Sequence, residues 1–299
     1  MPTPDNPVPA ENPRVCRVSP EERSGVAQML GLLEDPGLAD DVWLMAAWRG
    51  NRLAGGLWVR PQPGATALVE PPLVLPPDDV AIATALLCGA VQELSRAGMR
   101  LAQALIETPA AQYPESWQAA GFAHSADLAY LSAGESAFPV VLPDDGLQFE
   151  AFQESQSPRL ASLIEQTYQG SLDCPALDGV RNQDDVLSGY RATGLYDPAN
   201  WFFARQGGQD IGCLLLTTHP AGLEIADSPL ELVYMGVVPA ARGQGFGRGL
   251  VRYAQWHARR LGRRRLLLAV DASNQPAVRT YAECGFTAWA MRQVWLKFF

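Results

Sequence analysis

The order of predicted secondary structure repeats between the two halves of this 299-residue chain. In the second half the pattern predicts a hairpin, then a strand, a helix, a strand, a helix and a last strand-like segment, over residues 201–204, 211–218, 230–238, 245–261, 266–270, 276–285 and 286–299. Two anchors align the first half without gaps. Arg49 to Gly56 has the spacing of Arg205 to Gly212. Trp117 to Phe122 has the spacing of Tyr281 to Phe286. The repeat predicts a degenerate tandem duplication of an α/β domain.

Breaks in this pattern give the domain bounds. Residues 1–14 contain five prolines and little that could pack, which predicts a mobile tail. Small and turn-forming residues from about 133 to 146 separate the two patterned regions. We therefore predict a first domain over 15–135, a linker over 136–146 and a second domain over 147–299. The strand that ends Val74-Leu75-Pro76 is expected to match the one that ends Val237-Val238-Pro239.

Composition excludes several classes of protein. The longest apolar stretch, Val80 to Val91, is too short to cross a bilayer and is interpreted as the buried face of a helix. No basic region followed by an apolar core begins the chain, so we expect a cytoplasmic protein without a membrane partner. The five cysteines and three histidines are scattered, so neither a disulfide framework nor a metal site is predicted.

Charge is distributed unequally along the chain, whose net charge is −9. Residues 1–150 carry 8 basic and 19 acidic side chains, whereas residues 151–299 carry 15 and 13. Between Arg242 and Arg265 there are eight arginines and no acidic residue. An anionic ligand is therefore expected near this segment. Nucleic acid is not, because the basic stretch is short and lies in no nucleic-acid-binding module. Arg263, Arg264 and Arg265 are interpreted as a solvated turn, with a phosphate contact as the alternative.

The segment VVPAARGQGFGR, residues 237–248, predicts an anion-binding turn. A strand ends at a proline, and glycines then lead into a helix whose first N–H groups have no partner within the helix. The predicted binding residues of this turn are Arg242, Gly243, Gln244, Gly245, Phe246, Gly247 and Arg248. A tight turn without ligand is one alternative. A dinucleotide fingerprint with Asp271 as ribose ligand is another, but the glycine spacing differs and too few residues follow.

A second group of residues lies in NQPAVRTYAECGF, residues 274–286. Asn274 follows the strand 266–270, where its side chain could hydrogen-bond an extended ligand. Tyr281 comes two helical turns later and could direct its hydroxyl toward the same crevice. Taken alone, Tyr281 would be interpreted as an aromatic residue that packs on the sheet.

Together these motifs resemble the GNAT acyltransferase superfamily. Its R-x-x-G-x-G motif is matched by Arg242, Gly245 and Gly247. Its later N-x-x-A-x-x-x-Y-x-x-x-G-F pattern is matched from Asn274 to Phe286. The resemblance is close over roughly residues 201–295, whereas the first half matches only in element order. The tandem arrangement is also similar to that of the mycothiol synthases within this superfamily. The implied fold is two tandem GNAT-like α/β domains, each a mixed twisted sheet flanked by helices.

The resemblance implies an N-acyltransferase that uses acetyl-CoA as co-substrate and no metal. A primary amine would be acetylated directly in a ternary complex, with the amine and the oligomeric state left open. Backbone groups of Met235, Gly236 and Val237 would bind the pantetheine arm and polarise the thioester carbonyl. The turn at 242–248 would bind the pyrophosphate, and Asn274 would contact the pantetheine. The alternative from another class is a non-catalytic CoA-binding or structural GNAT-like protein.

Two side chains are the candidates for proton transfer. Tyr281 would protonate the departing thiolate as general acid. Glu231, on the strand before the glycine turn, would take the proton of the amine through a water, and the alternative is an exposed carboxylate at a strand end. His219 is the weaker candidate for the base and is otherwise interpreted as a loop residue.

The first half departs from both motifs. Two carboxylates, Asp78 and Asp79, stand where the glycine turn would be, and Trp117 and Ala110 replace the tyrosine and asparagine. We therefore expect a scaffold there and not a second catalyst. The segment 286–299 has length for one good strand, so we expect the other domain to help complete the opening that admits the thioester.

Overall fold

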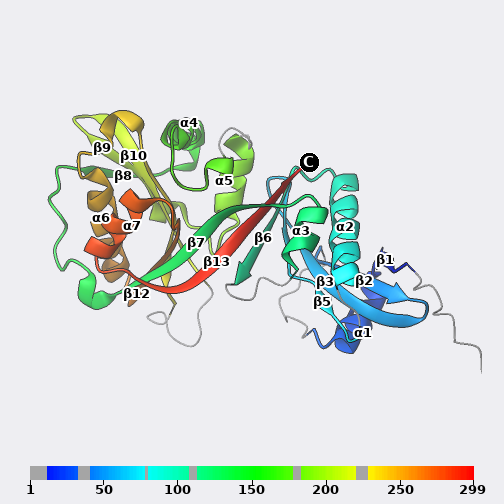
Figure 1. Ribbon diagram of the computed structural model, residues 1–299. Helices are drawn as coiled ribbons and strands as arrows, with labels where there is room; N and C mark the ends of the chain where they lie inside the picture. The colour runs from blue at the N-terminus through cyan, green and yellow to red at the C-terminus, as the bar shows by residue number, and fades with distance from the viewer. Residues whose placement is uncertain (1–11, 33–40, 78–79, 108–112, 178–182, 220–227) are drawn as a thin grey trace, which may run out of the picture. The chain divides into compact units, whose positions relative to one another are not determined.

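The protein is described from a computed structural model that covers residues 12–32, 41–77, 80–107, 113–177, 183–219 and 228–299 (Figure 1). The chain divides into two compact units. The first unit comprises Met1–Pro61, Ala65–His124 and Trp295–Phe299, and the second comprises Gln62–Gly64 and Ser125–Val294. The predicted tail lies outside the described residues up to residue 11, and Arg14 already begins a strand.

The described residues of the first unit form a sheet and three helices. Its strands are β1 (Arg14–Arg17), β2 (Trp43–Arg49), β3 (Arg52–Gln62), β4 (Thr66–Val69), β5 (Leu73–Val74) and β6 (Leu101–Glu107). Its helices are α1 (Pro20–Leu30), α2 (Val80–Arg96) and α3 (Pro114–Ala119). The strand order is β1-β2-β3-β4-β6, and β5 pairs with β3. The expected strand ending at Val74-Leu75-Pro76 is thus a two-residue strand, because Pro71 and Pro72 interrupt it.

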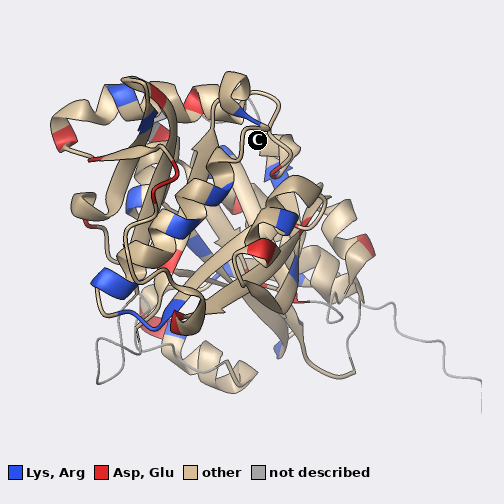
Figure 2. Ribbon diagram, turned by 90° about the vertical axis from the view of Figure 1, so that its left-hand side faces the viewer, with Lys and Arg blue, Asp and Glu red and all other residues tan. Residues whose placement is uncertain are grey.

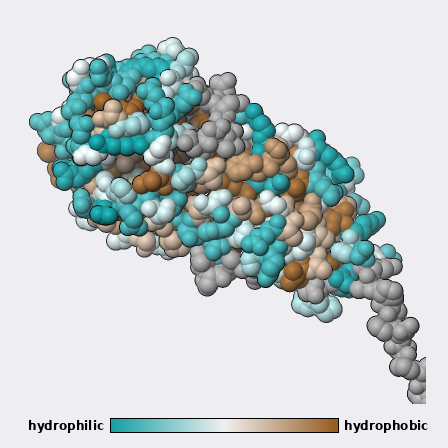
Figure 3. All heavy atoms as spheres, turned by 45° about the horizontal axis from the view of Figure 1, so that its top comes forward, coloured by the Kyte–Doolittle hydropathy of each residue, from teal (hydrophilic) through white to brown (hydrophobic). Residues whose placement is uncertain are grey.

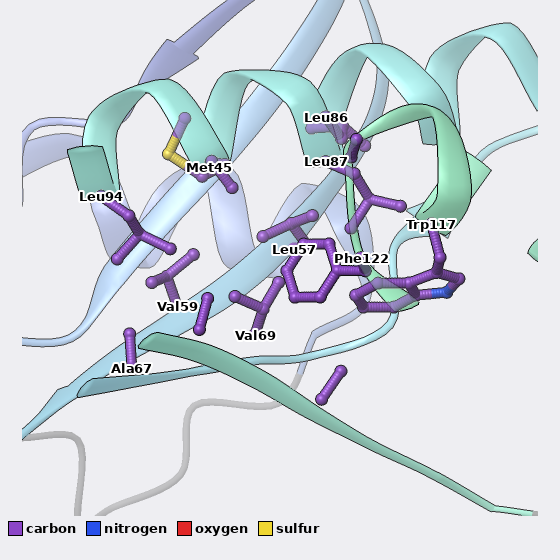
Figure 4. Packing of buried hydrophobic residues seen from close by; sticks show 14 of the residues in the cluster. Met45, Leu57, Val59, Ala67, Val69, Leu86, Leu87, Leu94, Trp117 and Phe122 are labelled. Carbon is purple, nitrogen blue, oxygen red and sulfur yellow. The ribbon is translucent and has the colours of Figure 1, made fainter. Parts of the chain in front are cut away.

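The core of the first unit lies under α2 (Figure 4). Ile82, Leu86 and Leu87 face β2, β3 and β4 and are fully buried, so the apolar run from Val80 to Val91 is confirmed as a helix face. Trp117 of α3 packs edge-on against Phe122 at 5.0 Å between ring centroids. Helix α1 covers the opposite face of β2 and β3.

The second unit contains a mixed sheet with helices on both faces. Its strands are β7 (Ala123–Gly134), β8 (Gln148–Ala151), β9 (Trp201–Gln206), β10 (Gln209–Thr218), β11 (Leu230–Val237), β12 (Arg265–Asp271) and β13 (Thr287–Phe298). Its α-helices are α4 (Ser157–Tyr168), α5 (Gln183–Arg191), α6 (Phe246–Arg260) and α7 (Gln275–Glu283). Short 3₁₀ helices span Glu135–Ala137, Glu154–Gln156, Pro175–Leu177, Pro198–Asn200 and Pro239–Ala241.

The strand order β13-β7-β12-β11-β10-β9-β8 explains where the second unit begins. β7 pairs antiparallel with all of β12, from Leu128 opposite Asp271 to Gly134 opposite Arg265. Residues 125–134 therefore belong to the second unit, although the sequence bounds assigned them to the first domain. The sheet of the second unit thus includes a strand that the sequence bounds placed in the first domain. Trp295, near the end of β13, is in turn buried in the core of the first unit.

Helices cover both faces of the second sheet because successive apolar side chains along its strands point to opposite faces. Leu214 and Leu216 of β10 pack with α6 and α7, whereas Cys213 and Leu215 pack with α4 and α5. The hairpin, the next strand, the two helices and the last strand all form close to their predicted bounds. Helices α4 and α5 were not predicted.

An ionic network holds α4 on the sheet. Arg159 of α4 donates to Glu150 of β8 and to Asp210 of β10, each at 2.6 Å. Its guanidinium carbon lies 3.8 Å from the ring centre of Phe203. The pKa of Glu150 is lowered to about 2, mainly by the hydrogen bond from Arg159. Because one planar guanidinium serves two strands, this contact fixes the angle of α4 across β8 and β10.

The predicted linker is an irregular segment that exposes Val140, Val141 and Leu142. Figure 3 shows a face on which hydrophilic residues dominate and apolar residues form smaller groups. Within the described residues, no helix is both long and apolar enough to cross a membrane.

His257 of α6 is buried in the second unit, with 3% of its surface exposed. Its Nε2 lies 2.8 Å from Asn200 Oδ1, and its ring lies 5.0 Å from that of Phe202. Burial, followed by the charge of Arg260, lowers the pKa of His257 to about 4. The imidazole is therefore neutral near pH 7.

We expect the stability of the second unit to fall in acid because of His257. Its folded pKa lies below the unfolded value of about 6.5, so the unfolded chain binds the proton first as the pH falls. The contribution of His257 to the free energy of unfolding is fully present above about pH 6.5 and is lost as the pH falls toward 4. The total loss is about 3 kcal/mol. Urea unfolding at several pH values measures it. His257→Gln should flatten this dependence, and His124→Gln, at an exposed position, should not. An equal acid loss in wild type and His257→Gln would assign the effect to other groups.

Candidate active site

The central feature of the second sheet is an early end to the pairing of β11 with β12. The parallel ladder joins Leu230 to Leu266, Glu231 to Leu267 and Leu232 to Leu268, and it stops there. On its other edge β11 continues to pair with β10 up to Val237, with one extra residue, Val233, between the pairs at Leu232 and Tyr234. A β-bulge of this kind bends the strand. The two strands therefore separate beyond Leu232, with backbone groups at the edge of each.

The residues predicted to bind an extended ligand, Met235, Gly236 and Val237, lie on β11 beyond this separation. A side chain at Gly236 would lie 2.6 Å from Thr167 of α4, so only glycine fits there. The Thr167 hydroxyl lies 2.7 Å from the hydroxyl of Tyr234 on the same face. Close packing of α4 on this stretch fixes the position of the free edge.

The glycine turn lies between β11 and α6. Gly243 and Gly245 have φ values of +76° and +83°, which other residues rarely adopt. Gly247 lies in the first turn of α6, and a Cβ at any of these three positions would meet no atom within 4 Å. The space in front of the helix N-terminus is therefore open. The N–H of Arg248 donates to Gly245 O at 3.1 Å, whereas those of Phe246 and Gly247 have no backbone partner among the described residues. Donors of this kind at a helix N-terminus suit an anion.

The two arginines of this turn differ in what they contact. The Arg242 side chain donates to three backbone oxygens, those of Val237, Gly170 and Thr167, at 3.0, 3.0 and 2.8 Å. It thus links the end of β11 to the last turn of α4. Arg248 is exposed, and its guanidinium makes no hydrogen bond or ion pair with another described residue. Arg248 is consequently the side chain of the turn that is available to an anion.

Asn274 and Tyr281 lie on α7. Asn274 Oδ1 accepts from the N–H of Ala277 and caps the helix, which leaves its amide NH₂ without a partner in the described chain. Tyr281 is 6% exposed and packs edge-on against Phe286 at 5.7 Å. Burial, then the charge of Asp173, raises the pKa of Tyr281. The ring of Tyr281 therefore packs in the core, while its hydroxyl stays protonated and has no hydrogen-bond partner among the described residues.

Glu231 and His219 are brought together by the structure. His219 Nε2 and Glu231 Oε2 are in direct contact, and both side chains are partly exposed. Glu231 opposes Thr217 of β10 and Leu267 of β12, in the last stretch where β11 is paired on both edges. The two candidates for proton acceptor in the sequence thus form one pair beside the separation of the strands.

Asp271 does not fit the alternative of a ribose ligand. It is 3% exposed, and its two carboxylate oxygens accept from the N–H groups of Ser273 and Cys174, at 2.8 and 3.2 Å. Asp173, in the loop after α4, accepts from the N–H of Asp271 at 2.9 Å. Sequence reasoning missed Asp173, because nothing in the loop sequence shows that it folds over the end of β12.

The corresponding part of the first unit has a different chemistry. Trp117, the counterpart of Tyr281, is fully buried, and its indole N–H has no hydrogen-bond partner. Asp78, Asp79 and Ala110 lie outside the described residues.

The arginines at 263–265 already have interaction partners within the chain. Among them, Arg263 donates to the carbonyl of Ser228 at 3.4 Å. Figure 2 shows basic and acidic positions interspersed over the second unit. Within the described part of the chain, no three His, Cys, Asp or Glu side chains are arranged to hold a metal ion.

Comparison with known proteins agrees with this geometry. Residues 164–286 match the model of the acetyltransferase (GNAT) family. A mycothiol acetyltransferase of Geodermatophilus obscurus is 38% identical over 102 residues, which is 34% of this chain and 33% of the relative. One from Thermomonospora curvata is 32% identical over 158 residues, 52% of this chain and 50% of the relative. The matches span between a third and a half of these relatives.

Solved structures extend the similarity in fold to the whole chain. A GCN5-related N-acetyltransferase from Sphaerobacter thermophilus has a TM-score of 0.62 at 16% identity and covers 96% of both chains. A tandem GNAT protein from the clavulanic acid biosynthesis pathway has a TM-score of 0.54 at 15% identity and covers 96% of this chain and 98% of its own. These neighbours confirm the predicted fold class of two tandem GNAT-like domains.

Proposed function

We propose that the second unit of this chain, whose residues 164–286 match the model of the acetyltransferase (GNAT) family, is an acetyl-CoA-dependent N-acetyltransferase. The partial similarity to mycothiol acetyltransferases and the tandem fold support this proposal. The observation that carries the proposal is the early end of the β11–β12 ladder directly before an open, glycine-lined helix N-terminus. An extended ligand with a phosphate group at one end fits these two features together.

The chain's own residues account for binding along this path. The first turn of α6 and Arg248 bind the pyrophosphate, while Arg242 positions the turn through its three carbonyl contacts. The free edge of β11 at Met235 to Val237 binds the pantetheine arm and directs N–H groups at the carbonyl oxygen. The amide NH₂ of Asn274 donates to the same arm. Acetyl-CoA supplies the activated acetyl thioester.

Two side chains move protons in the proposed reaction. Tyr281, kept protonated by its raised pKa, donates a proton to the leaving thiolate. Glu231 accepts a proton from the attacking amine, and His219 orients its carboxylate through their direct contact. Tyr281 of the second motif and Glu231, on the strand before the first motif, thus take complementary roles as acid and base.

The acceptor is proposed to be a primary amine related to that of the mycothiol acetyltransferases. This finer proposal is supported by their similarity over part of the chain. A screen with acetyl-CoA and a panel of amines tests it: the amine acetylated by those relatives, cysteamine, glucosamine and a dipeptide. Mass spectrometry of the acetylated product is the readout, because an aminothiol would itself react with a thiol reagent. Binding of CoA without turnover of any amine would favour the non-catalytic alternative.

We expect one molecule of acetyl-CoA to bind per chain and Gly247→Asp to weaken its binding. The new carboxylate opposes the pyrophosphate and removes a contact worth ~1.5–3 kcal/mol, so Kd should rise by roughly ten- to a hundredfold. Calorimetry gives Kd and stoichiometry. The melting temperature should not fall, because space is open at Gly247 and an acid suits a helix N-terminus. Ala81→Asp, at the same helical position in α2, is the matched control and should leave Kd unchanged. A stoichiometry near two would contradict an empty first unit.

Tyr281→Phe should lower kcat by ~10²–10⁴ while acetyl-CoA affinity holds, because only the proton donor is lost and the ring still packs on Phe286. Steady-state kinetics and thermal melts on the same preparation measure the two effects. Trp117→Phe, at the matching position of the first unit, should leave kcat nearly unchanged. If kcat per folded molecule falls less than about threefold while the melting temperature drops, Tyr281 only packs.

Glu231→Gln should lower kcat/KM for the amine by ~10²–10⁴ at pH 7 and by less at a pH near the pKa of the amine, where base catalysis is no longer needed. His219→Asn keeps the carboxylate and should have the smaller effect. A pH–rate profile of the three proteins decides between the two bases. The reverse order of severity would make His219 the proton acceptor.

A further inference from the structure

The loop between α4 and α5 is tied to the end of β12 by two reciprocal hydrogen bonds. Asp271 N–H donates to Asp173 Oδ1 at 2.9 Å, and Cys174 N–H donates to Asp271 Oδ2 at 3.2 Å. The second oxygen of Asp271 accepts from Ser273. Both oxygens of Asp271 are therefore satisfied by backbone donors. Asp173 Oδ2, by contrast, has no partner in the described chain.

The charges of these two carboxylates are not compensated. No arginine, lysine or histidine of the described residues forms an ion pair with Asp173 or Asp271. Although Asp173 is exposed as a residue, its carboxyl group lies over the end of β12, and burial there, followed by the charge of Asp271, raises its pKa. Two neighbouring carboxylates without a counter-ion destabilise one another, and a cation bound between them relieves that cost.

A second, independent observation is the hydroxyl of Tyr281. Tyr281 is 6% exposed, so more than nine-tenths of the residue is buried. Its hydroxyl makes no hydrogen bond to another described residue. The charge of Asp173 acts on it and contributes to its raised pKa. A hydroxyl without a hydrogen-bond partner, on a side chain whose ring is otherwise buried, is available to a polar ligand. The Tyr281 hydroxyl and Asp173 Oδ2 together thus offer two hydrogen-bond acceptors to one donor-rich group.

We propose that Asp173 binds the ammonium group of the acceptor and so selects cationic amines. The inference rests on the proposed function and adds the residue that recognises the second substrate. An ammonium has three N–H donors and a positive charge, which match Asp173 Oδ2, the Tyr281 oxygen and the uncompensated carboxylates. The proton is then lost to Glu231, so that Asp173 holds the amine and Glu231 activates it.

The test compares Asp173→Asn with wild type on the full chain. Asparagine keeps an oxygen for the Asp271 N–H and removes only the charge, so the loop anchor survives. We expect KM for the best amine of the screen to rise by roughly ten- to a hundredfold. The Kd of acetyl-CoA should stay within about twofold, and the melting temperature should not fall, because the variant also removes the repulsion between Asp173 and Asp271. Glu283→Gln, which removes the same charge from an exposed position of α7, is the control and should leave KM unchanged.

A second pair of variants keeps the proposal testable if Asp173→Asn does not fold. Asp173→Glu and Asp173→Gln are equal in length and differ in charge, so a lower KM for the glutamate variant supports charge recognition. Calorimetry with cysteamine and uncharged 2-mercaptoethanol on the CoA-saturated protein adds a readout without turnover: wild type should prefer cysteamine, and Asp173→Asn should not.

The outcomes separate the two proposals. Acetylation of an amine by wild type, with the same KM in Asp173→Asn, overturns the role of Asp173 and leaves the proposed function intact. Equal KM values for the glutamate and glutamine variants have the same meaning. Absence of both acetyl-CoA binding and turnover in wild type overturns the proposed function itself.

Discussion

The pairing of β11 with β12 ends after three residues, and the remainder of the second unit is organised by that early end. Each strand is held on its outer edge, β11 by β10 and β12 by β7 along its full length. The strands can therefore diverge without either leaving the sheet. Backbone groups at the inner edges are then available to a ligand, because buried N–H and C=O groups require partners. Packing of Thr167 against Gly236 keeps this opening in one geometry.

The first unit repeats this geometry and lacks its chemistry. Its strands β4 and β6 also pair in parallel over three residues, from Thr66 with Leu101 to Leu68 with Gln103. Trp117 packs edge-on against Phe122 just as Tyr281 packs on Phe286. The same kind of packing pair is thus present in both units. A hydroxyl is present in one unit and an indole in the other. Under the proposed function, this position therefore serves packing in the first unit and also offers a proton in the second.

Periodicity in the sequence was sufficient to predict the elements that carry both motifs. The hairpin, β11, α6, β12 and α7 follow from alternating or helical spacing, and positive φ at Gly243 and Gly245 agrees with the predicted turn. The bulge at Val233 could not be predicted, because one extra residue in a strand leaves no mark in an apolar pattern. Helix α4 did leave a signal, since Leu160, Leu163 and Ile164 have helical spacing.

Contacts between distant segments were beyond reach of the sequence. Asp173 meets Asp271 across 98 residues, and Arg242 meets Thr167 across 75. In both cases a charged side chain takes backbone partners, which local composition does not indicate. The role expected of Arg242 depended on its charge alone, and the structure gives it carbonyl partners at the C-terminal end of α4.

These contacts place groups of opposite charge at different positions around the site. The uneven distribution of charged residues along the sequence did not predict these positions. The partial positive charge of the α6 N-terminus and Arg248 lie at one end of the opening between the strands. Asp173, Asp271 and Glu231 contribute negative charge at β12 and β11. Arg242 donates its hydrogen bonds to carbonyls at the C-terminal end of α4, which is the negative end of the helix dipole. It therefore holds α4 against the end of β11 and adds little charge to the anion site. Under the proposed function, the positive groups attract the anionic co-substrate, and the carboxylates attract the cationic amine.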